Sequence, residues 1–249
     1  AAGEIGQLPN DPDIAAIHMW GGVDNPYATG AMRAEFALVQ APIPLGPWRA
    51  VFAPSNVMAR ECFLDEIAHE VKQDPFELRR SLLGQHPRHK AVLELAAQKA
   101  GWGTPRAGIT RGIAVHQSFN TYVAQVVEVS GEDSSLKIER VVCAVDCGVA
   151  VNPNIVAMQM ESGIGYGLSA ALSGASTLKD GVVEQSNFHD YPVIRMNEMP
   201  KVEVFIVPST EKPTGVGEPG IPVIAPALAN AILAMRGRPI RALPMSSQG

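Results

Sequence analysis

The first half of the chain changes from an irregular to a helical pattern of apolar residues. Proline and glycine interrupt residues 1–54 so often that we expect loops there, with a short strand over 34–40. From 55 to 72 the apolar residues recur at helical spacing, which predicts a helix with Ser55 or Asn56 as its cap.

Two further helices are expected before residue 110. Asp74 can cap the first of them, because its carboxylate accepts free backbone N–H groups, and Pro75 fits the first turn. Gly84 ends this helix. The other runs from about 90 to 99, and Gly101 follows its end.

The second half alternates between strand and helix patterns. Strands are expected over 112–116, 122–129, 136–146 and 201–207, and helices over 152–171 and 226–235. The helix over 152–171 contains Gly163, Gly165 and Gly167. Because each glycine costs up to ~1 kcal/mol inside a helix, the three indicate close approach of another backbone or of a ligand.

This order of elements favours an α+β fold with mixed sheets and packed helices. Helices and strands do not alternate strictly, as they would in a doubly wound parallel sheet. We expect two parts: a loop-rich segment with three helices over 1–110, and an α+β lobe over 111–249.

Composition excludes several classes of protein. Hydrophobic residues make up 46% and charged residues 18%, which is typical of a globular chain with a substantial core. The net charge of -5 and the absence of a basic run disfavour nucleic acid as a partner. Three cysteines, without a second Cys/His pair, are expected to be core thiols and not a disulfide framework or a zinc site.

An acidic loop over 215–220 is the first candidate for chemistry. Two glycines flank Val216, and Glu218 is followed by Pro219 and Gly220. A carboxylate on such a rigid bend can act as a general base. The residues alone also fit an ordinary surface turn with an exposed glutamate.

Two other segments carry weaker signals. Gly46-Pro47-Trp48-Arg49 could bind a phosphate or line a pocket, or Trp48 could fill the core while Arg49 is solvated. Asp146-Cys147-Gly148 leads into a helix whose first amides could bind an anion. The spaced glycines at 163–167 lie inside that helix, so they do not form a dinucleotide-binding turn. No Gly-x-Ser-x-Gly motif supports a hydrolase.

The order of these motifs resembles the xanthine oxidase family of molybdenum hydroxylases. The resemblance rests on four segments: Gly46–Arg49 followed by Glu61-x-Phe63-x-Asp65-Glu66, Asp74-Pro75-x-Glu77-x-Arg79, Asp146-Cys147-Gly148 with Asn152-Pro153 and Gln159-x-Glu161, and Gly215–Pro219. It covers about residues 20–245 and is greatest to the isoquinoline 1-oxidoreductase β subunit and bacterial aldehyde dehydrogenases. The chain then corresponds to the C-terminal portion of a molybdopterin-binding large subunit.

The resemblance implies a molybdenum–molybdopterin cofactor, commonly the cytosine dinucleotide form in bacteria. The metal is held by the pterin dithiolene, so no protein metal ligand is expected. Glu218 matches the catalytic base, which activates a water-derived oxygen for attack on an aldehyde or N-heteroaromatic substrate. Gln159, Trp48, Arg49 and Gly217 match residues that lie near the cofactor.

The resemblance also implies partners. Electrons would leave through [2Fe–2S] clusters on a small subunit, with a cytochrome c subunit as a further option, so activity requires other chains.

Two features depart from the family: its Gly-Gln-Gly cofactor loop is missing here and belongs to the remainder of the large subunit, and Ser162 stands where a glycine is common. A non-catalytic homologue that only assembles with a catalytic chain is the alternative. The resemblance favours a periplasmic or membrane-associated location over a cytoplasmic one.

Overall fold

A four-stranded sheet forms the centre of the computed structural model, which describes residues 18–35, 37, 43, 46–131 and 135–245. The helices are α2 (Ala53–Glu70), α3 (Pro75–Leu82), α4 (Pro87–Ala100), α5 (Pro153–Leu172) and α6 (Ile224–Arg236). The sheet strands are β1 (Thr110–Ser118), β2 (Thr121–Ser130), β3 (Lys137–Asp146) and β6 (Lys201–Ile206). β1, β2 and β3 are antiparallel neighbours, and β6 pairs parallel to β3. This architecture confirms the expected α+β class.

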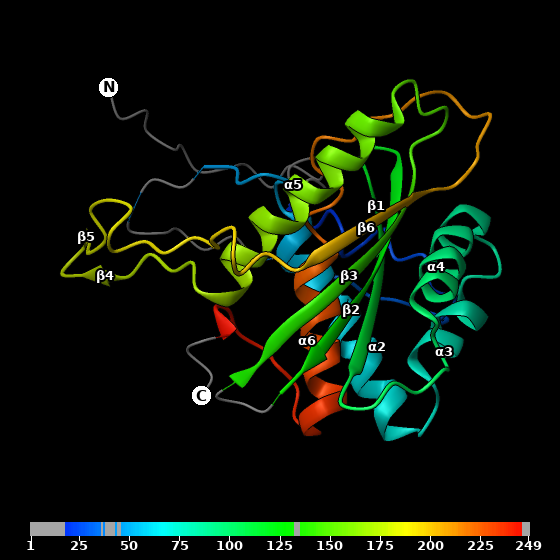
Figure 1. Ribbon diagram of the computed structural model, residues 1–249, viewed down its shortest axis with the longest axis horizontal. Coiled ribbons are helices and arrows are strands. Elements are labelled where there is room, and N and C mark those ends of the chain that lie inside the picture. The colour runs from blue at the N-terminus through cyan, green and yellow to red at the C-terminus, as the bar shows by residue number, and fades with distance from the viewer. Residues whose placement is uncertain (1–17, 36, 38–42, 44–45, 132–134, 246–249) are drawn as a thin grey trace.

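Helices cover both faces of the sheet (Figure 1). Val123 and Val127 of β2 belong to the core shared with α5 and α6. Ala124 and Val126 point the other way and pack with α4. Because both faces are buried, the central strands are nearly continuous apolar runs and show little alternation.

The glycines of α5 explain how the loop before α6 packs. A Cβ on Gly163 would lie 3.3 Å from the backbone of Gly220, and one on Gly167 would lie 2.4 Å from Cγ2 of Ile224. At Gly165 the neighbour is Sδ of Met199, at 3.2 Å. The expected close approach of another backbone is therefore confirmed at Gly163, where α5 meets the segment that carries Glu218.

A buried ion network joins α2 to its neighbours. Glu61 is fully buried, and its Oε2 accepts hydrogen bonds from Nε of Arg79 at 2.9 Å and from the backbone N–H of Val115 in β1 at 3.2 Å. Its Oε1 accepts from Arg60 at 3.1 Å and from the Tyr27 hydroxyl at 3.0 Å. Removing one partner of such a buried pair typically costs about 3–5 kcal/mol. The Glu61 and Arg79 positions of the sequence motifs thus have a structural role.

Most expected helix and strand boundaries lie within a few residues of those observed. Asp74 caps α3 as expected, because its Oδ1 accepts from the N–H groups of Phe76 and Glu77. The expected cap of α2 is wrong: the helix begins at Ala53, and its N-cap Phe52 makes no side-chain bond.

Several other expectations differ from the structure or fall outside it. α4 begins at Pro87, three residues earlier than expected. The strand expected over 34–40 falls mostly outside the described residues, and 34, 35 and 37 are not in a strand. A short hairpin of β4 (Leu178–Lys179) and β5 (Val182–Val183) was not expected. The division at residue 110 stays a prediction.

The three cysteines are buried free thiols, as expected from their number and spacing. Burial raises the pKa of the Cys62 and Cys143 thiols to about 12, so both stay protonated near neutral pH. In the part of the chain that the structure describes, no helix is both long and apolar enough to cross a bilayer.

Candidate functional site

Arg49 is the centre of a hydrogen-bond cluster that joins three distant segments. Its Nε donates to the carbonyl oxygen of Gly217 at 2.8 Å, and Nη2 donates to the same oxygen. Nη2 also donates to Oε1 of Gln159 at 3.1 Å, and Nη1 donates to Oγ of Ser162 at 3.1 Å. The guanidinium therefore connects the loop before α2 to one side of α5 and to the acidic loop. Of its five N–H donors, four bond to described residues, and a single one on Nη1 remains for another group.

The Glu218 carboxylate is held by the residue next to Arg49. Its Oε2 accepts a hydrogen bond of 2.6 Å from the backbone N–H of Ala50. Ala50 and Val51 both have left-handed backbone conformations, with φ of 76° and 56°. Such a conformation costs a non-glycine residue roughly 1–2 kcal/mol, and here it turns the Ala50 N–H toward the carboxylate. The other oxygen of Glu218, Oε1, makes no hydrogen bond within the described residues.

The loop that carries Glu218 is also fixed at both ends by β2. Oγ1 of Thr121 donates to the carbonyl oxygen of Gly215 at 2.8 Å. Nε2 of Gln125, a fully buried side chain, donates to the carbonyl oxygen of Gly220 at 2.8 Å. With Arg49 on Gly217 between them, three backbone carbonyls of the loop are bound. The Glu218 carboxylate is therefore mounted on a rigid support, which is what proton transfer at a fixed site would require.

Trp48 contacts α5 through an aromatic pair. Its ring stacks on that of Tyr166, with ring centroids 4.9 Å apart and an angle of 27° between the planes. The guanidinium of Arg49 lies 5.7 Å from the centroid of the same tyrosine ring. Both aromatic rings remain partly exposed, so Trp48 is not the core residue of the alternative interpretation.

The Asp146-Cys147-Gly148 motif builds the turn between β3 and α5. Arg88 donates two hydrogen bonds of 2.7 Å to the carboxylate of Asp146, and the N–H of Gly148 donates a third at 3.0 Å. Burial raises the pKa of Asp146, but these hydrogen bonds outweigh burial and hold it below its usual value. A Cβ on Gly148 would lie 2.1 Å from the carbonyl oxygen of Lys212, so only glycine fits there.

The five residues expected at the site lie together. Arg49 contacts Gln159 and Gly217, Trp48 precedes it, and Glu218 is bound to Ala50. Their expected contacts with a cofactor stay predictions. The sequence analysis missed Ala50, Thr121, Tyr166 and Gln125, and of these only Gln125 leaves a signal, as an amide in a run of apolar strand residues.

The polar groups of the Arg49 cluster fit a cofactor that brings its own ligands for the metal. Among the described residues, no three His, Cys, Asp or Glu side chains lie close enough to hold a metal ion. The cluster instead offers the Glu218 carboxylate as an acceptor and the amide nitrogen of Gln159, which donates to no described residue. Apart from Gly217 and its two chain neighbours, no atom of the described residues lies within 4 Å of the place where a Cβ on Gly217 would stand, so the loop has an open side.

Comparison with known proteins identifies the family. Residues 68–200 match the model of the molybdopterin cofactor-binding domain. The chain is 38% identical over 193 residues to isoquinoline 1-oxidoreductase subunit beta of Brevundimonas diminuta, an alignment that covers 75% of this chain and 25% of that protein. It is 31% identical over 253 residues to a membrane-bound aldehyde dehydrogenase (pyrroloquinoline-quinone) of Gluconacetobacter polyoxogenes, covering 90% of this chain and 32% of that protein. The chain thus spans a quarter to a third of these curated relatives.

Solved structures show the same fold. Quinoline 2-oxidoreductase from Pseudomonas putida 86 superposes with a TM-score of 0.70 at 11% identity, over 81% of this chain and 52% of that chain. Aldehyde oxidoreductase from Desulfovibrio gigas gives a TM-score of 0.60 at 13% identity, over 79% of this chain and 40% of that chain. The chain therefore belongs to the xanthine oxidase family of molybdenum hydroxylases, where it matches part of the molybdopterin-binding large subunit.

Proposed function

We propose that this chain supplies the catalytic base of a molybdenum hydroxylase that oxidises aldehydes or N-heteroaromatic compounds. The observation that carries the proposal is the carboxylate of Glu218, which is held at Oε2 by the Ala50 N–H while Oε1 makes no bond in the described chain. The names of the two relatives, an isoquinoline oxidoreductase and an aldehyde dehydrogenase, support the substrate class.

The base acts through one oxygen. Because Ala50 occupies Oε2, the proton of the water-derived nucleophile is accepted by Oε1. Arg49 holds the Gly217 carbonyl one residue before the base, so the carboxylate keeps its position as it takes up the proton. Exchange of the proton with solvent then restores the carboxylate.

The expected cofactor is molybdopterin with molybdenum, in the cytosine dinucleotide form. Gln159, Trp48, Gly217 and the remaining Nη1 donor of Arg49 are the residues that would hold it. When bound, the cofactor takes the two electrons of the oxidation. The guanidinium of Arg49 is a cationic donor, which suits an anionic phosphate group of the cofactor.

The electrons are expected to leave through [2Fe–2S] clusters on a small partner subunit. The three cysteines of this chain are buried free thiols and are fewer than the four that a [2Fe–2S] cluster commonly takes. The working enzyme is then a hetero-oligomer that contains the remainder of the large subunit.

The source of the inserted oxygen tests the function. The native complex is supplied with isoquinoline, which has no oxygen of its own to exchange, in water labelled with heavy oxygen, and the product is analysed by mass spectrometry. We expect the label in the product and molybdenum in the purified complex. Product oxygen that comes from dissolved O2, or turnover by a molybdenum-free complex, would contradict the proposal.

A further inference from the structure

Three buried polar atoms on β1 and β2 make no hydrogen bond with any described residue. They are Nε2 of His116, Oγ of Ser118 and Oε1 of Gln125. The three residues are at most 3% exposed, so bulk solvent does not reach these atoms. Because an unpaired buried donor or acceptor is costly and rare, a group of three needs a common explanation.

The strand register brings these side chains to one face of the sheet. His116 and Ser118 are two residues apart on β1, so their side chains point to the same face. His116 pairs with Val123, and Gln125 is two residues further along β2. Gln125 therefore lies diagonally across from His116 on that face, at a spacing that long side chains can bridge.

The acidic loop over 215–220 packs on the same face. Thr121 and Gln125 point to this face from β2, because they are four residues apart on one strand. Their side chains donate to the carbonyl oxygens of Gly215 and Gly220. A carbonyl oxygen can only accept, so the amide nitrogen of Gln125 faces the loop and its Oε1 is left as a free acceptor. The unpaired atoms thus adjoin the loop that carries Glu218.

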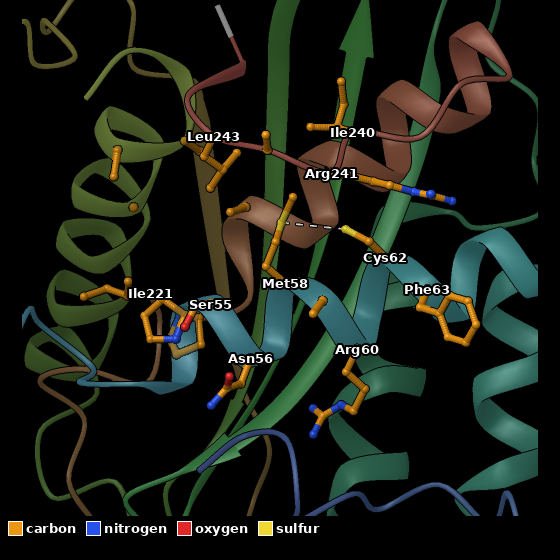
Figure 2. A pocket seen from close by; sticks show the side chains of 18 of the residues that line it. Ser55, Asn56, Met58, Arg60, Cys62, Phe63, Ile221, Ile240, Arg241 and Leu243 are labelled. Atoms are coloured by element: carbon orange, nitrogen blue, oxygen red, sulfur yellow. Dashed lines mark hydrogen bonds between the residues drawn. The ribbon is translucent and has the colours of Figure 1, made fainter. Parts of the chain in front are cut away.

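Arg60 fixes the tautomer of His116. It projects from α2 on the side opposite Met58 and Cys62 (Figure 2), and its Nη2 lies 3.2 Å from Nδ1 of His116. A guanidinium can only donate, so Nδ1 is the acceptor and Nε2 carries the hydrogen. Burial, with Arg60 and His89 nearby, holds the pKa of His116 well below its usual value, so the ring is neutral near pH 7.

The three unpaired atoms have the hydrogen-bonding character that a water molecule matches. The Nε2–H of His116 can only donate, Oε1 of Gln125 can only accept, and the Ser118 hydroxyl can do either. A metal ion would be repelled by the His116 N–H, and an anion by Oε1 of Gln125. A water molecule both donates and accepts, and buried waters typically make about three hydrogen bonds to such groups.

We infer that His116, Ser118 and Gln125 hold one buried water molecule, through which His116 positions Gln125 and the acidic loop. The water restrains the Gln125 amide at Oε1, as the Gly220 carbonyl does at Nε2. His116 is then a positioning residue, which acts on the loop through the water and Gln125. The positioning role rests on the proposed function, in which this loop carries the base, whereas the water site does not depend on it.

A high-resolution crystal structure of the native complex tests the water site. We expect a water about 2.7–3.2 Å from Nε2 of His116 that also contacts Oε1 of Gln125 or Oγ of Ser118. In the His116→Leu complex this water should be lost. A direct hydrogen bond between these side chains, an ion in this place, or no ordered density would overturn the inference. The structure is read without turnover, so it decides the water site even for an inactive enzyme.

The kinetics of His116 variants test the positioning role. His116→Leu should lower kcat about three- to tenfold at unchanged KM and molybdenum content, the range of a neutral hydrogen bond. His116→Gln keeps an acceptor for Arg60 and a donor for the water, so it should restore most of the rate. The matched control is His89→Leu, another buried histidine, on α4, which covers the opposite face of the sheet. This variant should keep the kcat of the wild type.

Three kinetic results would overturn the positioning role. They are an unchanged kcat in His116→Leu, an equal loss in His89→Leu, and a loss that His116→Gln does not restore. Failure of the proposed function is recognised separately, because Glu218→Gln would then retain full activity while the crystal structure still decides the water site.

Discussion

Replacing Arg49 with lysine should slow catalysis while the cofactor stays bound. The arginine donates to Gly217, Gln159 and Ser162 at once, which requires a planar fork of several donors. Lysine keeps the positive charge but presents a single rotating ammonium group that cannot span the three acceptors. The carbonyl of Gly217, one residue before Glu218, then loses its hydrogen bonds to Arg49.

The magnitude follows from the bonds that are lost. A hydrogen bond to a charged group contributes about 1.5–3 kcal/mol when it is buried, and Arg49 is only half-buried, so we take about 1–3 kcal/mol for the set. Because about 1.4 kcal/mol corresponds to a factor of ten, kcat should fall roughly 10- to 100-fold. A displacement of a catalytic group by about 1 Å has an effect of the same size.

The assay compares kcat, KM and molybdenum content of the assembled Arg49→Lys enzyme with wild type. Arg80→Lys is the matched control, because Arg80 pairs with Glu77 on the exposed side of α3, away from the site. A fall in kcat at full molybdenum occupancy would support a positioning role. Unchanged kcat would refute the reasoning, and activity lost in proportion to molybdenum would show that Arg49 acts by holding the cofactor and not by positioning the loop.

Three further predictions concern stability. Gly112→Ala should destabilise the fold by at least about 2–3 kcal/mol, because its Cβ would lie 2.1 Å from the backbone nitrogen of Ala231; an unchanged melting temperature would contradict this packing of α6 on β1. Gly165→Ala should be neutral or stabilise by up to ~1 kcal/mol, since only the flexible Met199 side chain must move; a large drop in thermal stability would argue against it. Burial lowers the pKa of His89 to about 3, so the unfolded chain binds the proton first as the pH falls. The free energy of unfolding should therefore fall by about 1.4 kcal/mol for each pH unit below about 6.5. His89→Leu should reduce this slope in denaturant titrations between pH 6 and 4, and an unchanged slope would refute the assignment.

Local signals account for the elements that the sequence predicted correctly. Asp74 with Pro75 begins α3 because a side-chain acceptor and a residue without N–H both suit the first turn. The start of α2 was misplaced because Phe52 offers no capping atom, so the helix begins where tertiary contacts and Pro54 allow it. The parallel pairing of β6 with β3 could not be predicted, since it depends on a long connection through α5.

At the candidate site, too, some features could be predicted from the sequence and others could not. Glu218, Gln159 and Arg49 could be named from their motifs, but the motifs do not show that Arg49 bonds to the loop that carries Glu218. The left-handed conformation of Ala50 could not be foreseen, because a non-glycine residue adopts it only when surrounding contacts hold it there. Gln125 was overlooked because a single amide in an apolar strand indicates burial without naming its partner, which is the carbonyl of Gly220.

The most direct test of the central claim is the rate at which substrate reduces the Glu218→Gln enzyme under anaerobic conditions. Glutamine keeps the shape of the side chain and can still accept the hydrogen bond from the Ala50 N–H, but its amide does not take up a proton at the pH of the assay. With molybdenum content equal to wild type, the rate should fall by roughly 10²- to 10⁴-fold, the usual contribution of a general base. Glu211→Gln, an exposed change in the same segment, should leave it unchanged. A Glu218→Gln enzyme reduced as fast as wild type would contradict the role of Glu218 as the base.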